Sequence, residues 1–181
     1  VGDVISGMPS LRSGLSRGDF AENWIAAVRK CAEHHCLTAG VRRIAGNRVY
    51  GRIASVSRRI NCPPHGRGAE FLRGQAGFSN VTNSRLRRKL NNWYLDHRLG
   101  GLCNSTTRCH MASDLSRYLY ASCFASVHRR SPKLFELPGA LKPDHQNADS
   151  DDFDDRFRVQ LRGGPATTLM SHIAKDGHYY I

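Results

Sequence analysis

The carboxyl-terminal segment of the chain carries its clearest sheet pattern. Between residues 157 and 162, apolar and polar side chains alternate, with Phe157, Val159 and Leu161 as the apolar members. A period of two is typical of a half-buried strand, here with a polar, basic outer face. Gly163-Gly164-Pro165 predicts a turn, and strand patterns follow at 167–173 and 178–181. The pattern stops at Ile181 and the chain opens without Met, so we expect it to be part of a longer protein.

Three segments have helical periodicity. Asp19 and Glu22 have the spacing of a capping box, which predicts a helix over 20–35. Apolar residues at helical spacing predict a second helix over 83–99, with Leu86, Leu90 and Trp93 or Tyr94 on one face. A third is predicted from Ser113 to His128.

The intervening segments predict strands and loops. Val49, Gly51 and Ile53 suggest strand character within 40–60, and Gly and Pro mark 61–77 as a loop. The segments 8–18 and 103–113 also have loop composition. The expected fold class is therefore α+β and loop-rich, with two to three helices and a small antiparallel or mixed sheet.

The chain is strongly basic. It has 27 Lys and Arg against 15 Asp and Glu, a formal net charge of +12. Such a balance favours a polyanionic partner, and nucleic acid is the first candidate. The alternative is a basic surface that is only solvated.

Neither a membrane span nor a metal site is predicted. No apolar run approaches the ~20 residues that cross a bilayer, so we expect no membrane partner and a cytoplasmic location. The six cysteines have no zinc-finger spacing, and we expect reduced thiols, no metal and no cysteine nucleophile. The cysteine–histidine groups considered are Cys31, His34, His35 and Cys36, and Cys103, Cys109 and His110.

Several segments resemble bacterial DNA (cytosine-5)-methyltransferases. Asn104-Ser-Thr-Thr-Arg108-Cys-His110 and its continuation to Ser122 resemble the late target-recognition region, as do Ser131-Pro132, 141–145 and 156–161. The stretch Pro165-Ala-Thr-Thr-Leu-Met-Ser-His172 through Ile181 is similar to the family's ninth motif. Met8-Pro-Ser-Leu-Arg12-Ser-Gly-Leu-Ser-Arg17-Gly18 is similar to the stretch that follows its eighth motif.

The resemblance implies an activity for the parent enzyme. Such enzymes flip a cytosine out of duplex DNA, add a cysteine thiolate to carbon 6 and transfer a methyl group from S-adenosylmethionine to carbon 5. They serve DNA methylation, including restriction–modification. The family's Pro-Cys, Glu-Asn-Val and Gln-x-Arg-x-Arg motifs and its glycine-rich cofactor loop are missing from these residues, and Cys62-Pro63 has the reversed order. We therefore expect no catalytic or cofactor-binding residue here, and no activity or S-adenosylmethionine binding by this chain alone.

The resemblance also implies a division of the chain and a set of DNA-binding residues. Residues 1–18 would connect to the absent catalytic domain, 19–148 would form the target-recognition domain, and 149–181 would hold an acidic loop and the start of the ninth motif. Base-reading residues are expected within 40–101. The residues expected to contact double-stranded DNA are Arg12, Arg17, Asn104, Arg108, His110, Thr167, Thr168, His172 and Lys175. The last four belong to the ninth motif, whose residues mainly brace the recognition domain in this family.

Two other hypotheses are open at this point. One is a stand-alone basic module that binds nucleic acid without enzymatic activity, and the other is a basic module that binds proteins.

Overall fold

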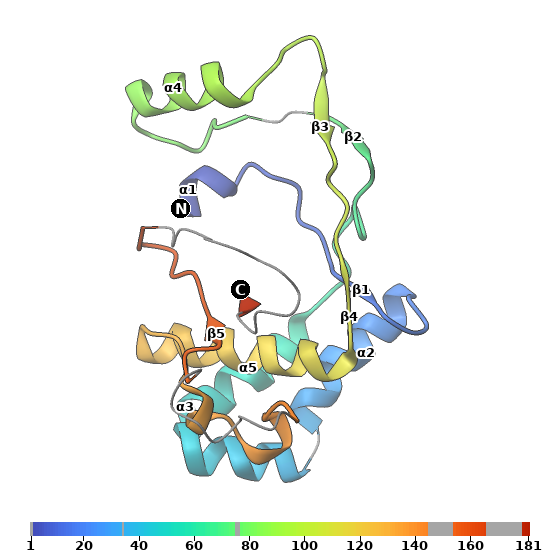
Figure 1. Ribbon diagram of the computed structural model, residues 1–181, viewed down its shortest axis with the longest axis vertical. Helices are drawn as coiled ribbons and strands as arrows, with labels where there is room; N and C mark the ends of the chain where they lie inside the picture. The colour runs from blue at the N-terminus through green and yellow to red at the C-terminus, as the bar shows by residue number, and fades with distance from the viewer. Residues whose placement is uncertain (1, 34, 75–76, 145–153, 166–178) are drawn as a thin grey trace. The chain divides into compact units, whose positions relative to one another are not determined.

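The computed structural model describes residues 2–33, 35–74, 77–144, 154–165 and 179–181. The chain divides into two compact units (Figure 1). The first unit combines Val1–Gly14 with Cys62–Cys109, and the second combines Leu15–Asn61 with His110–Ile181. The interval 19–148, expected as one domain, contributes residues to both units.

The second unit is mainly helical. It contains α2 (Ala21–Glu33), α3 (His35–Arg59) and α5 (Ala112–His128), which pack against one another. Two short 3₁₀ helices follow α5, η1 (Leu134–Glu136) and η2 (Gly139–Leu141). Strand β5 (Phe157–Arg158) pairs in parallel with β6 (Tyr179–Tyr180), and Phe157 lies opposite Tyr179.

The prediction of a strand within 40–60 is wrong, because this segment belongs to α3. The buried residues Val41, Ala45, Val49 and Ile53 recur every four positions, so they line one side of the helix. The alternation of Val49, Gly51 and Ile53 was too short to distinguish a strand from this spacing. At Gly46 the backbone leaves helical geometry, with φ 83° and ψ 169°, and the helix axis kinks there.

The core of the second unit lies where α3 meets α5. Tyr120, Ala121 and Phe124 of α5 are buried against the apolar stripe of α3, together with Leu134 and Leu137. The hydroxyl of Tyr120 donates a hydrogen bond to the backbone carbonyl of Glu136. This bond satisfies the polar atom of a side chain that is otherwise surrounded by apolar groups. Burial raises the pKa of Tyr120, so its hydroxyl keeps its proton.

The first turn of α5 differs from the expectation. The helix is preceded by Met111 rather than by Ser113, and the Met111 carbonyl accepts from the Asp114 and Leu115 amides at 3.0 and 3.3 Å. Asp114 forms a largely buried ion pair with Arg117, at 2.7 Å. Arg117 Nε also donates to the Leu141 carbonyl at 2.8 Å, which ties α5 to η2.

Helix α2 begins at Ala21, and the Trp24 amide donates to the Phe20 carbonyl at 3.1 Å, so Phe20 directly precedes its first turn. The Asp19 carboxylate accepts from the Leu15 backbone amide at 3.0 Å. The helix ends at Glu33, slightly before the expected boundary.

The first unit contains α1 (Gly2–Ile5), α4 (Ser84–Tyr94) and an antiparallel ribbon of β2 (Phe71–Arg73) and β3 (Gly101–Cys103). Strands therefore occur in the segment expected as a loop over 61–77. At the ends of the two units, β1 (Gly14–Leu15) pairs with β4 (Cys109–His110). The predicted helix over 83–99 is confirmed as α4, although it ends earlier.

The carboxyl-terminal pattern is confirmed in part. Phe157 is buried and β5 forms as a strand, and the Gly164 amide donates to the Leu161 carbonyl at 3.0 Å in the expected turn. The basic face is not fully solvated, because Arg156 is buried and Arg158 pairs with Asp155. The strand expected over 167–173 lies outside the described residues. The end of the chain forms β6, as expected.

The described residues thus form an α+β fold, which confirms the predicted fold class. They contain five α-helices, more than the two to three predicted, and short two-stranded sheets. No helix in the described ranges has the length and apolar character required to span a membrane.

The backbone geometry of Gly46 predicts a strong dependence on glycine. A Cβ placed there meets nothing within 4 Å, so Gly46→Ala tests the backbone alone. The region of φ and ψ that it occupies is open almost only to glycine, and we expect a loss of about 1–3 kcal/mol in the free energy of unfolding. Gly51→Ala is the matched control on the same helix. Its Cβ also meets open space, and we expect a gain of about 0.5–1 kcal/mol, measured by urea denaturation. Equal effects at both sites would contradict the kink.

The carboxylate of Glu136 predicts a dependence of stability on pH. Arg130 donates to both of its oxygens, at 2.5 and 2.6 Å, and the Lys133 amide donates at 2.8 Å. These bonds, chiefly those from Arg130, hold the pKa of Glu136 below its usual value. Because the pKa of Glu136 is lower in the folded chain than in the unfolded chain, its charge stabilises the fold at pH values above the unfolded pKa. This stabilisation is lost as the pH falls through the folded pKa.

We therefore expect Glu136→Gln to cost about 1 kcal/mol at neutral pH, since Arg130 is half exposed. The difference from the unsubstituted chain should begin to shrink below the unfolded pKa, at about pH 4, and disappear as the pH falls through the lower folded pKa. Thermal melts between pH 3 and pH 7 measure it, with the exposed Glu33→Gln as control. A cost that is independent of pH would contradict this role of the charge.

Candidate nucleic-acid interface

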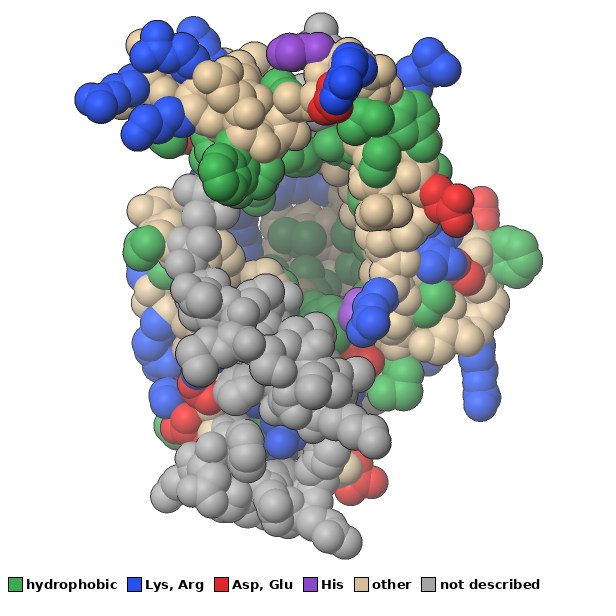
Figure 2. All heavy atoms as spheres, turned by 45° about the horizontal axis from the view of Figure 1, so that its top comes forward, with side chains coloured by type: hydrophobic (Ala, Val, Ile, Leu, Met, Phe, Trp, Pro, Cys, Tyr) green, Lys and Arg blue, Asp and Glu red, His purple; other side chains and the backbone are tan. Residues whose placement is uncertain are grey.

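Helix α4 carries the most concentrated positive charge in the first unit. Asn83 caps it, and its side chain accepts from the Leu86 amide at 2.9 Å. The helix has the sequence Ser-Arg-Leu-Arg-Arg-Lys-Leu-Asn-Asn-Trp-Tyr, with no acidic residue and no buried residue. Figure 2 shows the Lys and Arg side chains gathered over this helix. Such a helix requires a partner or solvent along nearly its whole surface.

The cations of α4 have no acidic partner among the described residues. In the part of the chain that the structure describes, none of them forms an ion pair. They are Arg85, Arg87, Arg88 and Lys89. Unpaired neighbouring cations repel one another, and a polyanion relieves this repulsion while releasing its counterions.

A ring contact anchors the carboxyl-terminal end of α4. Tyr94 packs against Phe78 with ring centroids 5.9 Å apart, and Phe78 and Val81 are buried beneath. Trp93 is 82% exposed. Leu86, on the same expected face, is also exposed. The sequence pattern identified the helix, and the structure shows that Leu86, Trp93 and Tyr94 are exposed.

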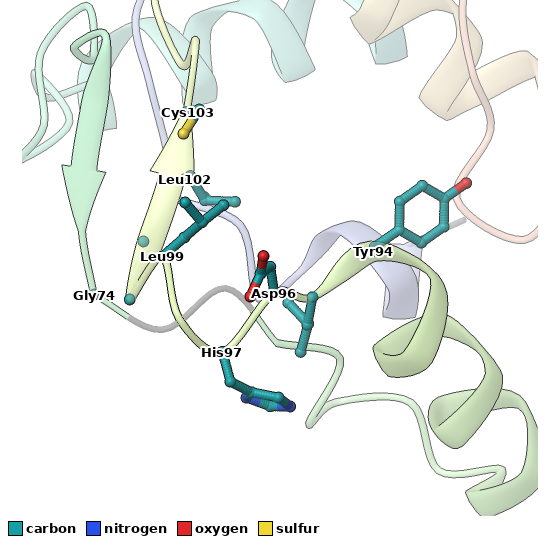
Figure 3. A pocket seen from close by; sticks show the side chains of 10 residues that line it. Gly74, Tyr94, Asp96, His97, Leu99, Leu102 and Cys103 are labelled. Atoms are coloured by element: carbon teal, nitrogen blue, oxygen red, sulfur yellow. The ribbon is translucent and has the colours of Figure 1, made fainter.

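A cavity of about 490 Å³ follows α4 (Figure 3). It is lined by Tyr94, by residues of the following loop other than Arg98, and by the ribbon residues Leu102 and Cys103. Asp96, His97 and Leu99 all line this space, and Figure 3 shows the His97 side chain extending in a different direction from that of Asp96. Arg98 donates to both oxygens of Asp96, at 3.1 and 2.9 Å, and holds the pKa of that carboxyl below its usual value. The cavity therefore presents a carboxylate that is already bound to a guanidinium.

Arg12 is placed inside the first unit. It is 7% exposed, its Nη1 donates to the Ser13 carbonyl at 2.9 Å, and its amide donates to the Gly66 carbonyl at 2.8 Å. Its own carbonyl accepts from the Thr107 hydroxyl at 2.7 Å. These bonds favour a structural role for Arg12 in joining the loops around Gly66 and Thr107.

Asn104 and Arg108 belong to the same unit, and both side chains are exposed. Asn104 has a positive φ of 54°, and its amide donates to the Glu70 carbonyl at 2.7 Å. The Arg108 carbonyl accepts from the Gly14 amide at 2.9 Å. The backbone of this segment is therefore fixed by hydrogen bonds, while the two polar side chains are free to reach solvent or a ligand.

Arg17 and His110 belong to the second unit. Arg17 is exposed and lines a cavity of about 910 Å³ together with Lys30, Asn23 and Met111. His110 lies with Nδ1 3.3 Å from the Tyr118 hydroxyl, and the two rings meet edge to face. The structure brings Arg17 together with a second cation, whereas His110 is half-buried in a local contact. Thr167, Thr168, His172 and Lys175 lie outside the described residues.

The described thiols differ between the units. Cys31 and Cys123 of the second unit are buried, which raises their pKa to about 11 and about 12. In the first unit, Cys62 is half-buried, and Cys103 and Cys109 are exposed. All five are free, and no group of three or more metal-binding side chains occurs among the residues that the structure places.

Comparison with protein families, with curated proteins and with solved structures finds no match to this chain.

A comparison of Lys89 with Arg98 separates the contribution of the α4 cations to polyanion binding from the effect of net charge. Lys89→Gln and Arg98→Gln each remove one positive charge, but only Arg98 is held by an acid. We expect Lys89→Gln to elute from immobilised heparin at clearly lower salt than Arg98→Gln, because an unpaired cation contributes more to polyanion binding. Equal elution of the two variants would mean that overall charge alone governs binding.

Proposed function

We propose that this chain binds duplex DNA and supplies target-sequence recognition for a DNA cytosine-5 methyltransferase. In this proposal, methyl transfer from S-adenosylmethionine to carbon 5 of cytosine is performed by a catalytic domain whose motifs these 181 residues do not contain. The observation that carries the proposal is the positive charge of α4, whose cations form no ion pair within the described ranges.

The position of α4 supports a recognition role. It lies within residues 40–101, where the resemblance to these methyltransferases implies that bases are read. An α-helix fits the major groove of B-DNA, and arginine pairs with guanine while asparagine pairs with adenine at base edges. Helix α4 exposes Arg85 and Arg88, and Asn92 lies between them and its end. It therefore offers both phosphate-binding and base-reading chemistry.

Residues of each unit add candidate DNA contacts. In the first unit, Asn104 and Arg108 expose polar side chains on a backbone held by hydrogen bonds. In the second unit, Arg17 and Lys30 line one cavity, where paired cations would accept a phosphate group. We assign Arg12 to positioning of the entry loop rather than to DNA contact, because its guanidinium is buried.

The proposal is tested by binding of labelled duplex DNA, followed by fluorescence anisotropy at several salt concentrations. We expect affinity to fall steeply with salt, with a slope of about −0.9 for each phosphate contact. Replacing Arg85, Arg88 and Lys89 by Gln should reduce the magnitude of the slope by roughly 2–3. Replacing Arg98 provides the control, since its charge is balanced by Asp96. Absence of duplex binding at low salt would overturn the proposal.

Two further measurements distinguish recognition for a methyltransferase from general binding. Selection from a pool of random duplexes should enrich a defined site that contains cytosine, whereas a stand-alone basic module would enrich none. Calorimetry with S-adenosylmethionine should show no binding. Tight binding of the cofactor would place catalytic machinery in this chain and contradict the division of labour.

A further inference from the structure

One row of side chains on α4 joins its cations to an exposed aromatic ring. Arg85, Lys89 and Trp93 are spaced four residues apart, so they follow one another along the same side of the helix. All three are exposed. Arg88 and Asn92 form the adjacent row at the same spacing. The exposed side of α4 therefore ends in an indole.

The indole of Trp93 has no partner within the described part of the chain. It is 82% exposed and makes no ring contact there, whereas its neighbour Tyr94 contacts Phe78. A tryptophan side chain has the largest apolar surface of any residue, and leaving it in water forgoes the free energy of burial. Leu86, about two turns earlier on the helix, is also exposed, which enlarges the apolar area beside the cations.

Charge decides between the possible occupants of this surface. An apolar protein surface would cover the indole but would leave the cations of α4 without counter-charge. A nucleic-acid strand offers both complements, because its phosphates are anionic and every base has a π-face. Four residues of helix separate successive members of the row by about 6 Å, so one strand can contact all three.

We propose that Trp93 stacks on an accessible nucleobase while Arg85 and Lys89 contact phosphates of the same strand. The inference rests on the proposed DNA binding and specifies one mode of it. Stacking requires a base that is unpaired, extruded or at an opened step, because a base inside a regular duplex already stacks on its neighbours. Trp93 therefore favours locally opened DNA and adds affinity with little dependence on base identity.

Tryptophan fluorescence tests this mode directly. The chain has two tryptophans, and Trp24 packs against the cluster of Leu15, Val28 and Leu115. The Trp93→Phe variant therefore reports Trp24 alone. The full chain and this variant are titrated with a single-stranded oligothymidylate, a regular duplex, the same duplex with one unpaired thymine, and heparin. Anisotropy of labelled DNA measures binding in parallel.

We expect the oligothymidylate and the duplex with the unpaired base to quench the emission of the full chain, and to quench the Trp93→Phe variant much less. Trp93→Ala should weaken binding of these two ligands by roughly 5- to 150-fold without changing the salt slope. Phe135→Ala removes a similarly exposed ring, 68% exposed, in the other unit and should leave binding unchanged.

The experiment distinguishes a failure of the stacking proposal from a failure of the proposed DNA binding. Binding by anisotropy without quenching of Trp93 would overturn the stacking role and leave DNA binding intact. Equal quenching by heparin, which has no bases, would also overturn it. Absence of binding to every nucleic acid at low salt would overturn the proposed function, and the stacking role with it.

Discussion

The packing of α5 against the apolar stripe of α3 is the interaction on which the second unit depends. Tyr120 and Phe124 fill the space beside Val49 and Ile53, and the segment after α5 closes over them through Leu134 and Leu137. Because Tyr120 buries a hydroxyl, the following 3₁₀ turn must present a carbonyl at the right place, and Glu136 does so. The same residue binds Arg130 through its carboxylate. One residue therefore couples the apolar core to the ion pair at its edge.

The first unit is organised by backbone hydrogen bonds more than by a core. Its strands are three residues long, and α4 has no buried residue. Loops around Gly66 and Thr107 are joined through the main chain of Arg12, through the Thr107 hydroxyl and through Arg67 Nη2, which donates to the Thr107 carbonyl at 2.8 Å. This construction leaves long polar side chains at the surface. It suits a unit whose proposed role is to present cations and aromatic rings to a ligand.

Sequence patterns predicted α5 and α4 well, because each has strong periodicity over several turns. They failed for α3, where β-branched residues and glycines imitate a strand over the few positions of 49–53. They also failed for single side chains, since exposure depends on contacts distant in sequence. Arg12 lies in a segment with the composition of a phosphate-binding loop. Its main chain is bonded to Gly66 and Thr107, which lie far along the sequence, so local composition could not show that Arg12 is buried. Trp93 has helical spacing with Leu90 and Leu86, and only the packing of Phe78 on Tyr94 indicates which side of the helix faces inward.

The unequal burial of the thiols has a consequence for chemical probing. Cys31 and Cys123 have raised pKa values and little exposure, so they react slowly at neutral pH, whereas Cys103 and Cys109 are accessible. Alkylating reagents reach thiols according to thiolate content and access. Among the cysteines that the structure describes, those open to reagents belong to the unit that carries α4. Of these five cysteines, a fluorophore or spin label coupled under mild conditions would therefore mark those of that unit in preference to Cys31 and Cys123.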